Sequence, residues 1–192
     1  MRFDPVCMIK YMFKKLPVYI STNADGYRFN LYLLTYPRWL TTIFVALRYH
    51  SLFYRCLVQD INTFEHSNSS TKLQPNSNLL TLLYHTYLPM FDLRFTLSTF
   101  VEPSFGLYPV SSLFQNLAWA ERETAEMFGI KFMGKKDNRH LLLDYSFTGF
   151  PMLKSFPVAG VAELFYSVNS SVISYYSLGL FESSKIENNF DF

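Results

Sequence analysis

Alternating apolar and polar residues predict most of the strands of this chain. Between residues 91 and 100, the odd-numbered positions are apolar or Thr, and the even-numbered positions up to 98 are polar. This period of two is typical of a strand with one buried face. The same period recurs at residues 27–33, after the turn-forming stretch 23–26. Further strands are expected at 18–21, 56–64, 79–87 and 161–168, with 79–87 and 91–100 forming a hairpin.

Two other segments carry apolar residues at helical spacing. The first begins at Pro37, where the missing N–H of proline costs nothing because the first helical position has no partner for it. The second ends before Gly129, because glycine readily adopts the left-handed backbone that follows a helix. Ser112 and Gln115 have the spacing of a capping box, so they predict the start of this second helix.

These elements predict an α+β fold: a mostly antiparallel sheet with two main helices packed on one side. We place this domain at residues 1–130. The remainder, 131–192, contains prolines and glycines that exclude a long regular element. It is expected to form a long extended C-terminal arm and tail that dock on partner subunits. The polar stretch 65–78 is expected to be an exposed loop.

Glu121 lies inside the apolar stripe of the second helix, between Ala118 and Ala125. A buried carboxylate needs a partner or a raised pKa, because burying an unpaired charge is costly. Basic residues follow the helix at once: Lys131, Lys135, Lys136, Arg139 and His140. We expect the cation to be Arg139 or a basic residue of a partner chain, since a guanidinium can bond both carboxylate oxygens.

The other charges of this helix are explained by a solvated face. Arg122 and Glu126 are four residues apart and could pair with each other, and Glu123 would face water. The segment 147–157 is either a self-packed loop or a strap that lies on another protein. Its length without regular structure favours a functional role, and its aromatic residues argue against disorder.

Composition excludes several functional classes. The net charge of the 192-residue chain is only +2, which is too small to indicate nucleic acid or an anionic membrane surface as a partner. No run of about 18 apolar residues predicts a membrane span, and neither a secretory signal nor a transit peptide is recognised. Aromatic residues reach 19% of the chain, which is typical of an AT-rich organellar gene and adds surface for partner contacts.

No cofactor or metal site is expected in this chain. Cys7 and Cys56 are the only cysteines, whereas iron–sulfur clusters and structural zinc usually need four ligands at characteristic spacings. No glycine-rich phosphate loop is present. A catalytic set formed by Glu121, Glu123 and Asp144 would lack a nucleophile and a metal, so no catalytic residue is assigned.

The stretch from Trp119 to Gly160 resembles, without a gap, the 30 kDa subunit of respiratory complex I, which is NADH dehydrogenase subunit 9 where mitochondria encode it. By order of elements, the resemblance extends from about Leu16 to about Tyr166. The resemblance implies that charged and aromatic residues and prolines of this stretch bind partner subunits: Glu121, Arg122, Glu123, Glu126, Lys135, Arg139, Asp144, Phe147, Pro151, Lys154, Phe156 and Pro157.

The resemblance implies a non-redox structural core subunit of proton-pumping NADH:ubiquinone oxidoreductase. Such a subunit lies in the hydrophilic arm on the matrix side of the mitochondrial inner membrane and holds the quinone-reducing module together. Its partners are the hydrogenase-like quinone-site subunit and neighbouring iron–sulfur subunits, so it meets the membrane only through the complex. FMN and iron–sulfur clusters belong to the parent complex, and the missing transit peptide fits an organelle-encoded chain.

The chain departs from the family pattern at several charged positions. Lys135-Lys136 replace a usual His-Pro, His140 replaces an Arg, and apolar or small residues replace charged or His positions at Thr148, Phe150, Leu153 and Ser155. Some charged contacts of the family are therefore expected to be replaced by apolar ones. The alternative interpretation is a free-standing α+β module that binds RNA through Lys131, Lys135, Lys136 and Arg139, although Asp137 and Asp144 interrupt this basic patch.

Overall fold

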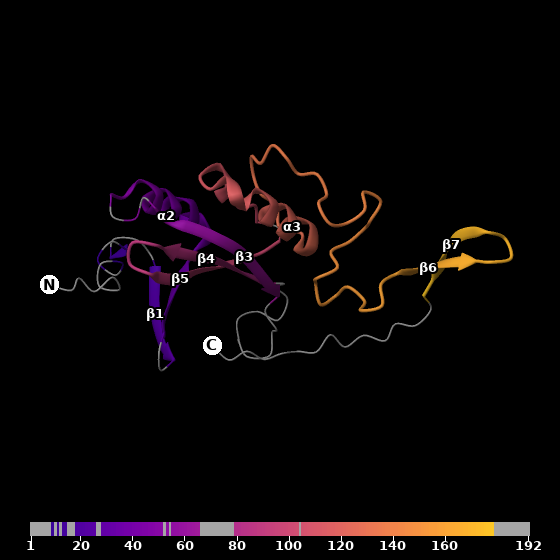
Figure 1. The fold of residues 1–192 in the computed structure, drawn as a ribbon, viewed down its shortest axis with the longest axis horizontal. Coiled ribbons are helices and arrows are strands. Elements are labelled where there is room, and N and C mark those ends of the chain that lie inside the picture. The colour runs from indigo at the N-terminus through magenta and orange to yellow at the C-terminus, as the bar shows by residue number, and fades with distance from the viewer. Residues whose placement is uncertain are drawn as a thin grey trace.

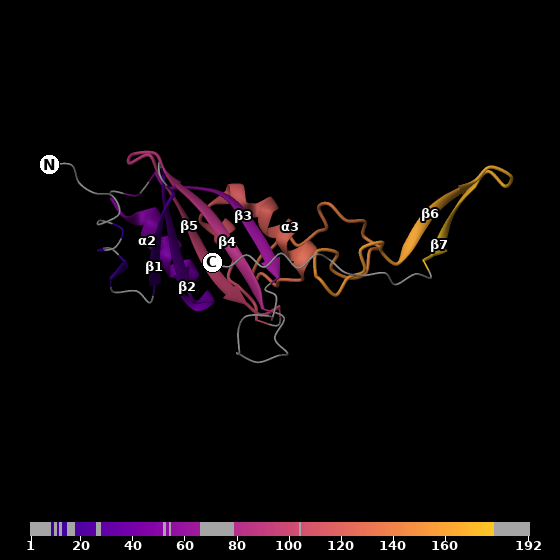
Figure 2. The ribbon, with the colours of Figure 1, turned by 90° about the horizontal axis from the view of Figure 1, so that it is seen from below.

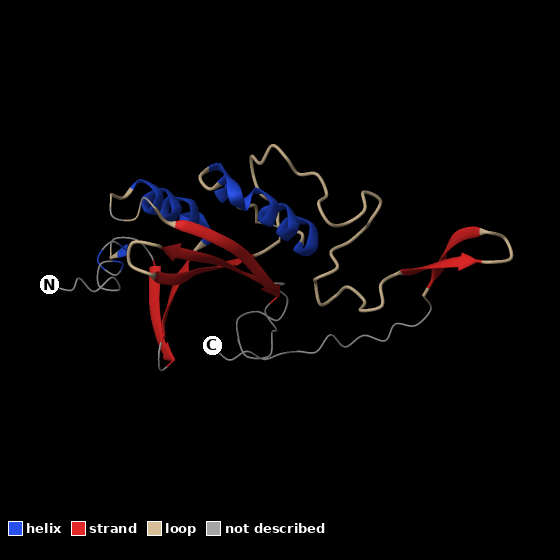
Figure 3. Ribbon diagram, viewed as in Figure 1, coloured by secondary structure: helices blue, strands red, loops and turns tan. Residues whose placement is uncertain are grey.

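The computed structural model describes residues 9, 11, 13–14, 18–25, 28–51, 53, 55–65, 79–103 and 105–178. Of the expected loop 65–78 only Glu65 is described, and Gly26, Cys7 and the tail from residue 179 lie outside the described residues. A five-stranded sheet forms one layer, and two helices form a second layer on one of its faces (Figures 1 and 3). This architecture confirms the predicted α+β class.

The sheet has the strand order β1-β2-β5-β4-β3. Its strands are β1 (Val18–Asp25), β2 (Arg28–Thr35), β3 (Leu57–Glu65), β4 (Leu80–Leu88) and β5 (Leu93–Val101). All neighbouring strands are antiparallel except β2 and β5, which run parallel. The predicted hairpin of β4 and β5 is confirmed, and so is the alternation of β5, whose odd-numbered residues are buried.

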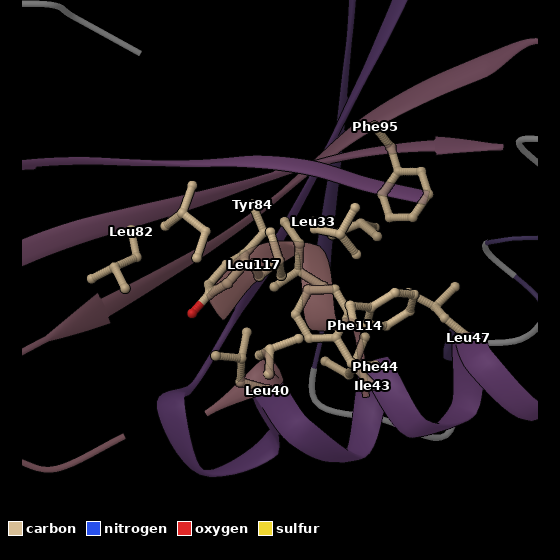
Figure 4. Close-up of a cluster of buried hydrophobic side chains, with 14 of the residues drawn as sticks. Leu33, Leu40, Ile43, Phe44, Leu47, Leu82, Tyr84, Phe95, Phe114 and Leu117 are labelled. Carbon is tan, nitrogen blue, oxygen red and sulfur yellow. The ribbon is translucent and has the colours of Figure 1, made fainter. Parts of the chain in front are cut away.

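Helix α2 (Pro37–Tyr49) covers the buried face of the sheet with one apolar stripe. Its Leu40, Ile43, Phe44 and Leu47 point toward the strands (Figure 4). The ring of Phe44 lies 5.2 Å from the ring of Tyr84 and 5.9 Å from that of Phe114, both edge-on. Each such fully buried side chain contributes about 1.5–3 kcal/mol relative to an exposed one.

Helix α3 (Ala118–Phe128) begins later than the sequence indicates. Two short 3-10 helices, η1 (Val110–Ser112) and η2 (Gln115–Leu117), precede it. The predicted capping box is wrong, because Ser112 Oγ donates to Pro109 O at 3.1 Å. Phe114 is extended between the two turns, so its ring enters the core against Phe44 and no continuous helix can run from residue 112.

The end of α3 is as predicted. Gly129 has a left-handed backbone with φ of 79°, and its N–H donates to Ala125 O at 2.9 Å. This bond satisfies one of the free carbonyls at the helix end. Within the described residues, no helix combines the length and the apolar character needed to span a bilayer.

Beyond α3 the chain has little regular structure until a second, two-stranded sheet. Strand β6 (Ala162–Ser167) was expected from the sequence, and it pairs in antiparallel fashion with β7 (Val172–Ser177), which was not. The sequence of β7 lacks a period of two because neither of its faces is buried. The division of the chain at residue 130 stays a prediction.

Candidate functional site

Three charged residues of α3 bond to one irregular segment, residues 135–143, which we call the clasp segment. Glu121 binds the side chain of Lys135, and Arg122 and Glu126 bind backbone groups of the segment. Helical spacing aligns Arg122 and Glu126, because residues four apart lie one above the other on a helix. Five of the twelve residues implied by the family resemblance therefore meet around this segment: Glu121, Arg122, Glu126, Lys135 and Arg139.

Glu121 is completely buried, and donors surround both of its oxygens. Its Oε1 accepts the N–H groups of Val110 and Ser111 at 2.6 and 2.8 Å. Its Oε2 accepts the Ser111 hydroxyl at 2.6 Å and the Lys135 ammonium at 2.9 Å. A buried ion pair that is satisfied by additional hydrogen bonds offsets its own desolvation cost.

The cation of Glu121 is thus Lys135, and the expectation of Arg139 is wrong. The Lys135 side chain is only 7% exposed. Its Nζ also donates to Ala118 O at 2.8 Å and lies 5.5 Å from the centre of the Phe132 ring. A slender ammonium on a long stem can enter this enclosed position between helix and ring, whereas Arg139 remains 72% exposed at the surface.

Arg122 binds the backbone of the clasp segment. Its guanidinium donates to Arg139 O and His140 O, both at 2.9 Å, and its Nη1 lies 3.6 Å from Asp137 Oδ2. The side chain is 10% exposed. The expected pair of Arg122 with Glu126 is replaced, because each of the two residues bonds to the clasp segment instead.

Glu126 is buried, so the expectation that it is solvated is wrong. Its Oε2 accepts the N–H of Leu141 at 2.6 Å, and its Oε1 accepts the N–H groups of Leu142 and Leu143. Burial raises the pKa of Glu126 most strongly, but the three N–H donors and nearby His140 together lower it below its ordinary value. Backbone donors carry no sequence signal, which explains why this role was missed.

Arg139 and Glu123 remain at the surface. Arg139 forms a bidentate pair with Asp137, at 2.9 and 3.1 Å, and hydrogen bonding to Arg139 lowers the pKa of Asp137 to about 2. Glu123 is exposed, as the solvated-face interpretation predicts. Asp144 is also exposed and accepts the N–H of Tyr145 at 2.8 Å, so it stabilises its own turn.

The segment 147–157 folds back on the domain. The rings of Phe147 and Phe156 lie 5.7 Å apart. The N–H of Met152 donates to Met127 O at 3.2 Å, and that of Lys154 donates to Glu65 Oε2 at 2.6 Å. Pro151 and Pro157 are half-buried along this path. These contacts favour the self-packed loop, and a role of the segment in binding partners stays a prediction.

The hydrogen bonds of Glu121 and Glu126 fix the path of the chain around α3. Each buried carboxylate of α3 uses both of its oxygens to hold another segment of the chain. Among the described residues, no group of three or more His, Cys, Asp or Glu could hold a metal ion. Cys56 is buried, and burial raises the pKa of its thiol to about 12.

The family match covers α2, strands β3 to β5, α3 and the clasp segment, and leaves out β1 and β2. Residues 37–162 match the family model described as respiratory-chain NADH dehydrogenase, 30 kDa subunit. NADH-ubiquinone oxidoreductase subunit 9 of Dictyostelium discoideum is 40% identical over 95 residues, covering 50% of this chain and 46% of that protein. NADH dehydrogenase [ubiquinone] iron-sulfur protein 3 of Beta trigyna is 29% identical over 167 residues, covering 85% and 81%.

The match to the Dictyostelium relative therefore spans about half of that protein's length. The same fold occurs in a chain of an archaeal respiratory membrane complex, the membrane-bound sulfane sulfur reductase, with a TM-score of 0.57 and 16% identity. That likeness covers 74% of this chain and 78% of the other. Because the family model includes both main helices and the clasp segment, the chain belongs to the family of the 30 kDa subunit of respiratory-chain NADH dehydrogenase, complex I.

Proposed function

We propose that this chain is a non-redox structural core subunit of the hydrophilic arm of a proton-translocating NADH:ubiquinone oxidoreductase. In this role it holds the quinone-reducing module together on the matrix side of the mitochondrial inner membrane. Its partners are the hydrogenase-like quinone-site subunit and neighbouring iron–sulfur subunits. FMN and iron–sulfur clusters of the complex are bound by other chains. Family membership and the names of the two relatives, both subunits of NADH:ubiquinone oxidoreductase, support this proposal.

The observation that best supports this proposal is that the buried charged side chains of α3 bond to groups of the same chain. Glu121, Glu126 and Arg122 bond to residues of this chain, chiefly to backbone groups. Such a network positions an irregular segment rigidly, because a buried charge that loses its partner costs about 3–5 kcal/mol. A subunit whose buried charges are paired within its own chain offers its neighbours a surface of fixed shape.

The alternative of a free-standing RNA-binding module is not favoured. Its basic patch comprised Lys131, Lys135, Lys136 and Arg139, and two of these four charges are neutralised: Lys135 is buried against Glu121 and Arg139 is paired with Asp137. Positive charges that are neutralised within the chain contribute little to phosphate binding.

The proposal is tested by solubilising respiratory membranes gently and separating native assemblies by size. We expect the chain to co-migrate with NADH:ubiquinone oxidoreductase activity, and mass spectrometry of the band to identify other subunits of that enzyme. Migration of the chain only as a small, free species contradicts the proposal. The purified chain is expected to bind neither flavin nor iron, and stoichiometric binding of either would place redox chemistry in this subunit.

A further inference from the structure

The β6–β7 hairpin exposes apolar side chains on both of its faces. It stands apart from the five-stranded sheet in both views (Figures 1 and 2). Nearly all of its strand residues are exposed, including Leu164, Phe165, Ile173, Tyr175 and Tyr176. An isolated two-stranded hairpin is at best marginally stable in water, so its strands need a cover.

The strand register divides these side chains between two faces. Leu164 is opposite Tyr175, and Tyr166 is opposite Ile173, so these four residues share the first face. The second face carries Phe165 and Tyr176, whose rings meet edge-on at 6.3 Å. Val172 lies on this second face too, together with the single charged residue of the hairpin, Glu163. A contact that covers one face leaves the other face in water.

The exposed apolar area approaches that of a protein interface. A buried aromatic side chain accounts for roughly 150–250 Å², so the four aromatic residues present roughly 400–600 Å². Exposed aliphatic side chains add to this area: Val161, Leu164, Val168, Val172 and Ile173. The total approaches the roughly 800 Å² that each partner contributes to a standard interface. Monomeric proteins rarely leave so large an apolar patch uncovered.

The two apolar faces and the two strand edges of the hairpin limit the kinds of partner that can cover it. Within the part of the chain that the structure describes, neither strand pairs with a third one, so both edges carry unpaired backbone N–H and C=O groups, which the hydrocarbon of a bilayer cannot satisfy. A second copy joined by a two-fold axis would cover one face only, and a copy on each face would extend into a filament. A cleft in a different protein can cover both faces and can bond an edge strand through its own backbone.

We propose that the β6–β7 hairpin inserts into an apolar cleft of a different protein chain, which supplies a basic side chain to Glu163. This inference rests on the proposed function in that the other chain is a neighbouring subunit of the same complex. The hairpin is then an attachment point separate from the clasp segment, whose Lys135 and Arg139 are paired within the chain.

Photo-crosslinking in native membranes tests whether the hairpin lies in a cleft of another subunit. A benzophenone amino acid is placed at Tyr175 on the first face, or at Tyr176 on the second face. The same probe at Tyr49, which is 77% exposed at the end of α2, is the control, since Tyr175 is 75% exposed. We expect both hairpin sites to crosslink to the same foreign subunit, at two different peptides of it, and Tyr49 to leave that subunit unlabelled.

Other crosslinks overturn the inference. A product that joins two copies of this chain identifies self-association, one within the chain identifies its own tail as the cover, and one with lipid identifies a membrane contact. Labelling from one face only excludes a two-sided cleft. If both faces label one protein that is foreign to the oxidoreductase, the cleft stands and the proposed function fails. If the chain co-migrates with the enzyme while neither site labels a subunit, the proposed function stands and the cleft fails.

Polar substitution gives an independent measure. Leu164→Ser on the first face and Val172→Ser on the second should each lower the amount of chain in the native assembly about tenfold, as loss of a buried interface contact does. Both positions are exposed, so folding of the chain is not expected to suffer. Tyr49→Ser is the matched control. Full incorporation of both hairpin variants would show that this surface stays in water.

Discussion

Lys135 and Arg139 are basic residues of the same clasp segment, but they differ in burial and therefore in how much each contributes to stability. The Lys135–Glu121 pair is enclosed, whereas Arg139 and Asp137 are 72% and 45% exposed. Surface ion pairs are typically worth about 0–1 kcal/mol, and removing one member of a buried pair costs about 3–5 kcal/mol. The position of a charge relative to the core therefore decides its weight.

We predict that Lys135→Met destabilises the chain by about 3 kcal/mol or more, because Glu121 then remains buried without a cation. Arg139→Met is the control and should change the free energy of unfolding by less than about 1 kcal/mol. Urea unfolding of both purified variants measures the difference. Equal losses for the two variants would contradict the assignment of the buried pair.

Glu126 should make stability depend on pH. Its folded-state pKa lies below the ordinary value of 4.5, so the unfolded chain binds the proton more readily. The stabilisation is complete above pH 4.5 and is lost as the pH falls through the folded-state pKa. We predict that Glu126→Gln lowers stability at pH 7 by about 1.5–3 kcal/mol, the value of a hydrogen bond to a charged group.

The acid profile distinguishes Glu126 from the exposed Asp137. In Glu126→Gln, the loss of stability just below pH 4.5 should be reduced. The loss between pH 3.8 and about 2, which the lowered pKa of Asp137 predicts, should persist. Thermal unfolding at a series of pH values measures both limbs, and Asp137→Asn should remove only the lower one. An unchanged upper limb in Glu126→Gln would refute the role of its carboxylate.

Residue patterns revealed that Glu121 needed a partner, but they did not identify the partner. A carboxylate in an apolar stripe indicates burial directly. The choice between Lys135 and Arg139 depends on how an irregular segment turns, which local sequence does not specify. Glu126 was harder still, since its donors are the N–H groups of Leu141–Leu143, and every residue except proline has one.

At the scale of elements, the predictions succeeded where one face is buried. The odd-numbered residues of β5 and the stripe of α2 follow simple periods. Tertiary packing overrode the local signal at Ser112, where Phe114 leaves helical geometry to enter the core. Strand β7 was missed because a hairpin exposed on both faces has no polar and apolar alternation to detect.

The junction of α3 with the following segment can be tested by comparing two glycines. Gly129 and Gly134 have almost the same φ, 79° and 78°, so alanine is strained at both by about 1–2 kcal/mol. A Cβ at Gly129 would also lie 2.7 Å from the Phe150 ring, whereas a Cβ at Gly134 meets nothing within 4 Å. We predict that Gly129→Ala costs about 1–3 kcal/mol more than Gly134→Ala.

Chemical unfolding of the two alanine variants measures this difference. Gly129→Ala combined with Phe150→Ala should fall to the cost of Gly134→Ala, because the ring that opposes the new methyl group is gone. If the extra cost survives removal of the ring, the contact of Phe150 with the end of α3 does not set the path of the chain.

At the scale of the whole molecule, the chain after α3 has two parts: a segment that is hydrogen-bonded to the α+β domain, and the β6–β7 hairpin, whose two strands bond to each other. The amides of Leu141, Met152 and Lys154 donate within the domain. We predict slow hydrogen exchange of these three amides in the purified chain, and fast exchange across β6–β7 until a partner covers it. Exchange mass spectrometry of free chain and native assembly checks this. Equally fast exchange of Leu141 and the hairpin in the free chain would contradict the division.

The buried pair also bears on the assembled complex. If this subunit only holds neighbours in place, a defect in it should lower the amount of complex and leave turnover unchanged. We predict that Glu121→Ala strongly reduces assembly, because Lys135 and the N–H groups of Val110 and Ser111 lose their acceptor. Glu102→Ala is the control, since Glu102 is an exposed carboxylate outside the residues that the family resemblance implies.

Native gels quantify the assembled complex in both variants, and NADH:ubiquinone activity is then expressed per assembled complex. For Glu121→Ala we expect a large fall in the band with normal activity per complex, and for Glu102→Ala no change in either quantity. A cost of about 3–5 kcal/mol is a large share of a domain's usual stability of roughly 5–15 kcal/mol, which explains why assembly rather than rate should respond. Full assembly with slow turnover in Glu121→Ala would show that this carboxylate acts in the reaction itself.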